Sequence, residues 1–181
     1  TRFCQVTGVQ TCALPISGNG KGKTTAAIGL TVRALGAGFR VFFAQFIKGG
    51  RYSEVDMLEK IAATGALVHK QYGKGCFIVR EAMEEDRKAA KEGLAEIREA
   101  MRSGDFQLIV MDEANVAAKL GLIETADLIG LIDEKPPMVE LVMTGRGASD
   151  ELIERADLVT EMKEIKHYYQ KGVNARRGIE S

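Results

Sequence analysis

Three short apolar segments that end in polar residues constrain the fold of this chain most strongly. The segments are "RVFFAQFI", "FQLIVMDE" and "VELVMTGR", and each is rich in β-branched or aromatic residues. Stretches of helical character separate them. Strands that are apolar throughout and are separated by helices are typical of a parallel sheet covered on both faces. We therefore predict an α/β domain with a mostly parallel sheet flanked by helices.

Helical and weaker strand patterns fill the rest of the chain. Helices are predicted over residues 23–38, 84–104, 124–135 and 149–156, and Ser149 is placed to cap the last of these. A weaker strand is predicted within residues 66–72 and a last strand within residues 157–167. In a parallel sheet, ligands bind beyond the carboxyl ends of the strands. Polar groups stand at three such ends: residues 18–25, 112–113 and 144–146.

Composition limits the classes of function. A chain of 181 residues with 45% hydrophobic content is expected to form one domain. Basic and acidic residues balance at 25 each, which argues against a broad nucleic-acid surface. No apolar run reaches the roughly 18 residues of a membrane span. Three cysteines without a CxxC pair favour a reducing cytoplasm, and two histidines argue against a multi-histidine metal site.

The segment "GNGKGKTT", residues 18–25, has the composition of a phosphate-binding loop. The pattern GxxxxGK[ST] places amide groups around phosphate oxygens, with a lysine that neutralises them and a hydroxyl that holds Mg²⁺. Gly22, Lys23 and Thr24 supply the end of this pattern, whereas Ser17 replaces its first glycine. The other interpretation of the segment is a structural turn.

The acids that end "LIVMDE" are the expected second half of a nucleotide site. Either Asp112 or Glu113 can orient Mg²⁺ directly or through water, although acids at a solvated strand end are also common. The two halves together predict binding of ATP with Mg²⁺. From these residues alone, the next inference is a Mg-dependent ATPase in which Glu113 positions water at the terminal phosphate, or a small-molecule kinase that cleaves at the same phosphate. A nucleotide-binding regulatory module without turnover is a third class.

The stretch from Gly18 to Glu180 resembles the P-loop-type cob(I)alamin (corrinoid) adenosyltransferases. The resemblance rests on "GNGKGKTTAA", "RALGAG", "QFIKG", "VMDEAN", "VMTGR", "ADLVTEMKEIKH" and "KGVNARRGIE". It implies the P-loop NTPase (RecA-like) architecture. It also implies transfer of the 5′-deoxyadenosyl group of ATP to the Co(I) of a reduced corrinoid, either cobalamin or cobyrinic acid diamide, with release of triphosphate. Co(I) is itself the nucleophile, so such an enzyme works by positioning and by stabilising charge.

The resemblance assigns roles to residues on the nucleotide side. Lys23, Thr24 and Glu113 are the catalytic candidates, and Thr24, Glu113 and Asp112 are the candidates for Mg²⁺. The residues expected to bind ATP are Gly18, Asn19, Gly20, Lys21, Gly22, Lys23, Thr24, Thr25, Arg33 and Arg146. For Arg33, a solvated helix arginine is the alternative.

On the corrinoid side the candidates are Phe77, Gln45 and Lys48. Some family members carry Phe and Trp two residues apart in mid-chain, where they help to displace the lower ligand of cobalt. This chain has no Trp, and Phe77 is the one substitute, with a core phenylalanine as the alternative. Glu54 is a further polar candidate or a surface acid. Lys166 and His167 match a family segment without an assigned role.

Residues 1–17 do not share the resemblance. We expect them to be a foreign leader before a single domain of residues 18–181, because Pro15 is unusual in a central strand. The alternative is a divergent but working strand. A foreign leader predicts lower stability and weaker ATP binding than in relatives. The family also implies a homodimer and an electron-donating flavoprotein as partners. The balanced charge and the lack of a long apolar run predict that neither nucleic acid nor a membrane is a partner.

Overall fold

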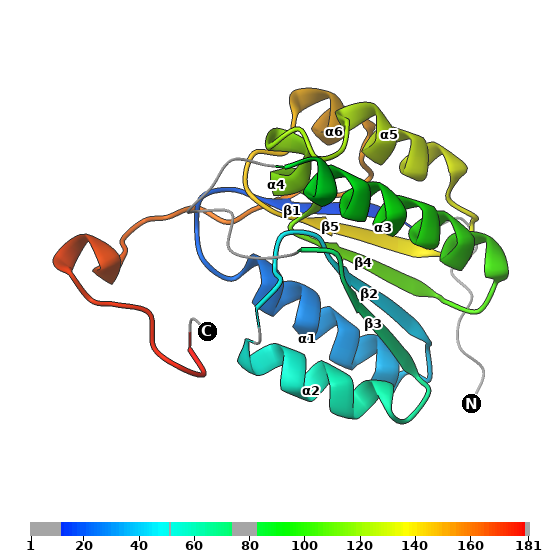
Figure 1. Cartoon of the computed structure of the whole chain (residues 1–181), viewed down its shortest axis with the longest axis horizontal. Helices are drawn as coiled ribbons and strands as arrows, with labels where there is room; N and C mark the ends of the chain where they lie inside the picture. The colour runs from blue at the N-terminus through cyan, green and yellow to red at the C-terminus, as the bar shows by residue number, and fades with distance from the viewer. Residues whose placement is uncertain (1–11, 51, 74–82, 180–181) are drawn as a thin grey trace.

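The computed structural model describes residues 12–50, 52–73 and 83–179, and within them a parallel sheet forms the centre of the molecule (Figure 1). The strand order is β3-β2-β4-β5-β1-β6. The strands are β1 Ala13–Ser17, β2 Val41–Gln45, β3 Leu67–Gln71, β4 Leu108–Asp112, β5 Glu140–Thr144 and β6 Thr160–Glu161. Every pairing between them is parallel, which confirms the predicted α/β class.

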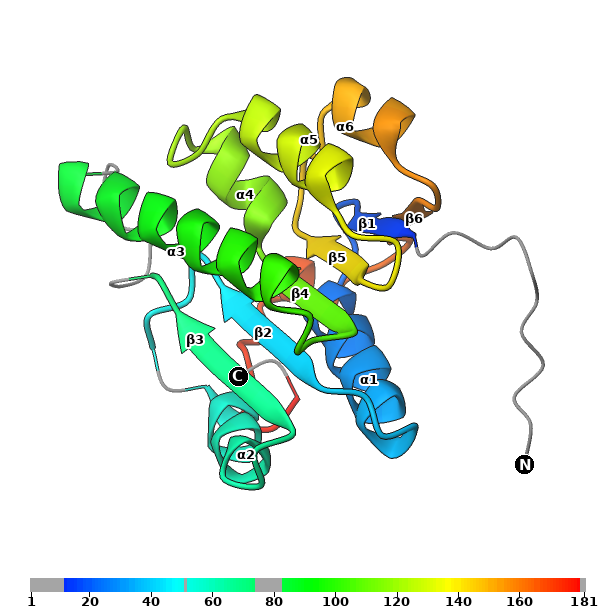
Figure 2. The ribbon, with the colours of Figure 1, turned by 90° about the vertical axis from the view of Figure 1, so that its right-hand side faces the viewer.

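Helices cover both faces of this sheet. They are α1 Lys23–Gly36, α2 Ser53–Ala62, α3 Glu84–Ser103, α4 Ala114–Lys119, α5 Thr125–Glu134 and α6 Asp150–Arg155, followed by the 3₁₀ helix η1 Tyr168–Lys171. Figures 1 and 2 show α1 and α2 on one face and the other four α-helices on the opposite face. Of the helices described, none combines the length and apolar character that crossing a bilayer requires.

The central strands are buried on both faces, and successive side chains point to different cores. In β2, Phe43 packs in the cluster below α1 and α2, whereas Phe42 packs in the larger cluster below α3 and α5. All five residues of β2 and of β4 are buried. This double burial explains why these strands are apolar throughout instead of alternating with polar residues.

Most predicted elements are confirmed, and the differences concern short ones. The hydroxyl of Ser149 accepts a hydrogen bond from the Leu152 amide at 3.2 Å, so it caps α6 as expected. The predicted last strand shrinks to Thr160–Glu161. Helices α2 and α4 were not predicted, and α4 has only six residues, "ANVAAK", which are too few to show a helical period.

Pro15 lies within β1, which corrects the expectation that proline disfavours a strand here. Backbone oxygens of Ala13 and Ser17 accept hydrogen bonds from the β6 side, from Leu158 and Met162. By the two-residue period of a strand, the peptide nitrogen of Pro15 faces the same side. The pairing with β6 begins only at Ile16 and Thr160, so the missing N–H removes no bond to β5. The origin of residues 1–17 stays a prediction.

Candidate active site

The three polar strand ends meet at the carboxyl edge of the sheet, as the sequence predicts. The loop after β1, Glu113 after β4 and Arg146 after β5 line a cavity of about 740 Å³. Its lining includes Gly20, Lys21, Gly22, Lys23, Thr24, Thr25, Lys48, Glu54, Glu113 and Arg146. Residues that lie far apart in the chain therefore face one space.

The glycine loop is held against the segment that follows β6. The Gly20 amide donates to the Met162 carbonyl at 2.6 Å. A Cβ atom added to Gly20 would lie 2.7 Å from that oxygen. A Cβ atom on Gly18, whose φ is +95°, would lie even closer to the same oxygen. Gly22 has φ +113° immediately before α1. These contacts explain why glycine stands at the alternate positions of the loop.

Lys23 is folded into the loop that precedes it. Its Nζ donates to the Gly18 and Gly20 carbonyls at 2.9 and 2.7 Å, and the residue is 7% exposed. Burial lowers the pKa of Lys23, although Glu113 and Asp112 oppose the shift. The amide groups at the start of α1 and this ammonium offer positive charge to the same space, as in anion sites at helix N-termini.

Asp112 is fully buried and its carboxylate is saturated with partners. Oδ1 accepts hydrogen bonds from the hydroxyls of Thr24 at 2.9 Å and Thr144 at 2.7 Å. Oδ2 accepts from the Gln45 amide at 3.1 Å and lies 3.5 Å from the Lys48 ammonium. Asp112 therefore fixes the hydroxyl of Thr24, which is the side chain that the phosphate-loop pattern places at a metal.

Lys48 lines the cavity and places its ammonium between the carboxylates of Glu54 and Asp112. Its Nζ lies 2.9 Å from Glu54 Oε1 and donates to the Thr24 hydroxyl at 3.3 Å. Burial alone would lower the pKa of Lys48, but the charges of Asp112, Glu54 and Glu113 outweigh it and raise this pKa. The ammonium thus stays charged beside the oxygens that would surround a cation.

Glu113 adopts an uncommon backbone conformation. Its φ is +62°, and among the described residues it is the only non-glycine with positive φ. Its amide donates to the Thr144 hydroxyl at 3.0 Å, while its side chain lines the cavity. Burial raises the pKa of Glu113, and the neighbouring charge of Asp112 adds to this. Strain and a shifted pKa at one residue are typical of functional positions.

Comparison with known proteins decides the family. The family described as ATP:corrinoid adenosyltransferase BtuR/CobO/CobP matches residues 11–181. This chain belongs to the ATP:corrinoid adenosyltransferase family. A corrinoid adenosyltransferase of Pseudomonas aeruginosa is 35% identical over 164 residues, which cover 91% of this chain and 80% of the relative. One from Escherichia coli is 29% identical over 186 residues, which cover 99% and 90%. The match begins before Gly18 and includes β1.

One nucleotide candidate lies away from the site of this adenosyltransferase-family chain. Arg33 is exposed in the last turn of α1, roughly 15 Å along the helix axis from Lys23 at 1.5 Å per residue. The helix starts at the loop and runs away from it, so the structure does not bring Arg33 to the cavity. Asn19, by contrast, is an exposed member of the loop itself.

Gln45 is placed differently from the expectation that it faces the corrinoid. It is fully buried, and its Oε1 lies 3.1 Å from His69 Nε2 and accepts from the Gln71 amide at 3.2 Å. Burial lowers the pKa of His69, which favours a neutral ring that donates from Nε2. Both ends of its amide are engaged, and Gln45 is not among the residues that line the cavity, so the structure shows it as a partner of Asp112.

Phe77, the aromatic candidate for the corrinoid side, lies outside the described residues. Lys166 is exposed, whereas His167 lines the cavity together with Gly178 and Ile179 of the C-terminal segment. The Lys21 ammonium donates to the Ile179 carbonyl at 2.7 Å. The C-terminal segment was not among the predicted site residues, although the resemblance of "KGVNARRGIE" to the family was the available signal.

Proposed function

We propose that this chain catalyses the reaction of its family at the 740 Å³ cavity: adenosyl transfer from ATP to a reduced corrinoid. The electron pair of Co(I) attacks the ribose C5′, a Co–C bond forms, and the C5′–O bond breaks. Triphosphate leaves with the bonding electrons. The observation that carries the proposal is the convergence of the glycine loop, Lys23 and Glu113 on one space in a chain of this family.

Charge stabilisation is the task of the protein in this reaction. The leaving triphosphate gathers negative charge, and the loop amides, Lys23 and Arg146 face the space that it would occupy. Lys23 would exchange its bonds to the Gly18 and Gly20 carbonyls for phosphate oxygens. Since Co(I) supplies the nucleophilic electrons, the proposal requires no general base.

The site also fits Mg²⁺. The oxygens of Thr24 and Glu113 are hard ligands of the kind that Mg²⁺ prefers, and Asp112 holds the Thr24 hydroxyl. In the described part of the chain, no group of three or more His, Cys, Asp or Glu side chains could hold a metal by itself. This agrees with an ion shared between a few protein oxygens and substrate phosphates. When bound, Mg²⁺ would neutralise charge on the triphosphate.

Three further features are proposed, the first two from family resemblance and the third from the cysteine pattern. They are a homodimer, reduction of the corrinoid by an electron-donating flavoprotein, and a cytoplasmic location. Light scattering during size-exclusion chromatography would test the first. Turnover of Co(II) corrinoid that depends on a reduced flavoprotein would test the second, and fractionation of cells would test the third.

Product analysis tests the proposed reaction. The protein is mixed with Mg-ATP and chemically reduced Co(I) corrinoid, and both the light-sensitive Co–C spectrum and triphosphate are followed. Matching amounts of adenosylcorrinoid and triphosphate are expected, and Lys23→Ala should abolish both. ADP and phosphate formed without corrinoid would instead support the ATPase or kinase, which family membership does not favour.

A further inference from the structure

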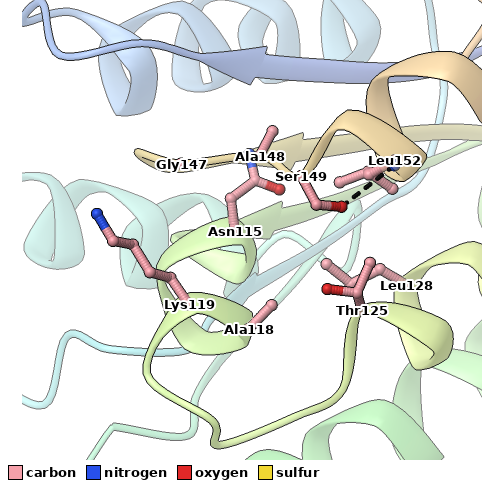
Figure 3. A pocket seen from close by; sticks show the side chains of 9 residues that line it. All are labelled: Asn115, Ala118, Lys119, Thr125, Leu128, Gly147, Ala148, Ser149 and Leu152. Carbon is pink, nitrogen blue, oxygen red and sulfur yellow. Dashed lines mark hydrogen bonds between the residues drawn. The ribbon is translucent and has the colours of Figure 1, made fainter.

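A second cavity lies at the same carboxyl edge of the sheet, on the opposite face from α1. It encloses about 220 Å³ between α4, the start of α5, the connection after β5, and α6 (Figure 3). Ala118, Leu128, Ala148 and Leu152 supply most of its apolar wall, and Asn115, Lys119, Thr125 and Ser149 supply polar groups. The site proposed above does not use this space.

Asn115 presents an unsatisfied oxygen to this cavity. The residue is 1% exposed, and its Nδ2 donates to the Gly145 carbonyl at 3.2 Å. A carbonyl can only accept, so this bond fixes the amide and leaves Oδ1 on the other side. Within the described residues, Oδ1 of Asn115 is buried and has no hydrogen-bond partner. In Figure 3 this oxygen is on the side of the amide that faces Ser149.

The lining selects one chemical class of ligand. A buried acceptor without a donor is unfavourable, so the cavity favours a group that brings an N–H or O–H to Asn115. No carboxylate is among the lining residues, which leaves a cation without a counter-charge. The exposed ammonium of Lys119, beside Gly147, would attract an anion, but the buried Asn115 oxygen would repel it. The Ser149 hydroxyl accepts from the Leu152 amide and keeps its own proton to donate. A neutral carboxamide matches this arrangement, because it donates and accepts at once.

Residues that are close in the chain line the two cavities. Glu113 lines the first, and Asn115, two positions later, lines the second. Arg146 lines the first and its neighbour Gly147 the second. A ring-shaped substrate whose metal faces ATP would therefore have its periphery near the second cavity. A corrin ring carries acetamide and propionamide arms around its edge, or the corresponding carboxylates.

We propose that the cavity beside Asn115 receives a carboxamide arm of the corrinoid and so selects amidated corrinoids over those with carboxylate arms. This inference rests on the proposed function. The arm donates its N–H to Asn115 Oδ1 and accepts from Ser149. A carboxylate arm can accept from Ser149 but offers no donor to Asn115, so it leaves that buried oxygen without a hydrogen bond.

Binding of two unreduced corrinoids in the presence of Mg-ATP tests the proposal. Cobinamide has carboxamide arms throughout, whereas cobyrinic acid has carboxylates, and equilibrium dialysis gives the dissociation constant of each. Ala118→Leu fills the cavity from α4 without touching the bond between Asn115 and Gly145. Ala95→Leu, at an exposed position of α3, is the matched control. A calorimetric titration with Mg-ATP shows whether the nucleotide site is intact in each variant.

The expected result is that Ala118→Leu weakens binding of cobinamide roughly tenfold, the scale of one lost hydrogen bond and its packing. Binding of cobyrinic acid and of Mg-ATP should not change, and Ala95→Leu should behave as the unmodified chain does. Asn115→Leu should reproduce the selective loss. Unchanged cobinamide binding in Ala118→Leu would overturn the proposal and leave the cavity to water. Product analysis run in parallel reports separately on adenosyl transfer, so its failure is distinguishable from failure of the arm site.

Discussion

The side-chain amide of Gln45 donates to Oδ2 of Asp112 at 3.1 Å, and both residues are completely buried. The bond joins the ends of β2 and β4, which pair in register at these two residues. It leaves Oδ1 of Asp112 to fix the hydroxyl of Thr24. A buried residue outside the cavity lining thus determines, through Asp112, how the Thr24 hydroxyl of the loop is oriented.

Replacing Gln45 with Met should therefore cost both stability and nucleotide binding. The substitution keeps the approximate length of the side chain but leaves one oxygen of Asp112 without its amide donor, at a cost of about 1–3 kcal/mol. Urea denaturation measures the free energy of unfolding, and titration with Mg-ATP measures the affinity. Gln71→Met removes only an exposed partner of Gln45 and is the control. Equal effects of the two substitutions would contradict the role given to Gln45.

Glu113 should make the chain without nucleotide less stable as pH rises. Burial raises its pKa in the folded state above its value in the unfolded chain, so the folded protein holds the proton more tightly. The stability that this provides is complete below the unfolded pKa and is lost as pH rises through the raised folded pKa. Glu113→Gln removes the ionisation and should flatten that part of the stability profile.

The measurement is thermal unfolding of both chains across the acidic range up to neutral pH. At neutral pH, Glu113→Gln should unfold at a higher temperature than the unmodified chain while forming little adenosylcorrinoid. Parallel stability profiles for the two chains would show that Glu113 does not carry this pH dependence.

Gly20→Ala should disrupt the loop. The added methyl group would lie 2.7 Å from the Met162 carbonyl and 2.8 Å from that of Lys163, both of which are backbone atoms with little room to move. We expect at least a tenfold loss of ATP affinity, equivalent to about 1.4 kcal/mol.

Gly29→Ala is the control, because that exposed position in α1 has open space around its Cβ. It should stabilise the chain by about 0.5–1 kcal/mol without weakening ATP binding. Similar ATP affinities in the two variants would rule out the steric role of Gly20.

Strand β1 is expected to be a weak point of this chain. Pro15 lacks the N–H that would face β6, and Ala13 contributes little side chain to the core. Replacing residues 11–17 with an apolar β-branched run such as "GLIIVYT" should raise the midpoint of thermal unfolding and tighten ATP binding. The experiment compares the two chains by calorimetry, with and without ATP. Equal midpoints would show that β1 works as well as the run designed to replace it.

Much of the fold could be predicted because its signals are local. The apolar runs of β2, β4 and β5 mark buried parallel strands, and the charge-dense period of α3 marks an amphipathic helix. Helix α4 was missed since six small residues carry no period. Helix α2 was missed since it buries only Val55 and Leu58.

The candidate site also has one part that the sequence predicts and another that only the folded chain shows. The glycine loop, Lys23, Thr24, Asp112 and Glu113 were predictable, because phosphate and Mg²⁺ chemistry requires those residue types at strand ends. The burial of Gln45 behind Asp112 was not, nor was the contact of Lys21 with Ile179, 158 positions away. Such contacts depend on strand order and on how the C-terminal segment returns to the loop.

The sequence by itself determined the parallel sheet, the phosphate loop and the family resemblance, because periodicity and motif spacing are properties of neighbouring residues. Only the tertiary structure decided that Arg33 points away from the site, that Pro15 faces the weakly paired edge, and that Asn115 turns an unpaired oxygen into a second cavity. Those outcomes depend on the direction of a helix, the side of a strand and the packing of residues far apart in the chain, none of which a local pattern records.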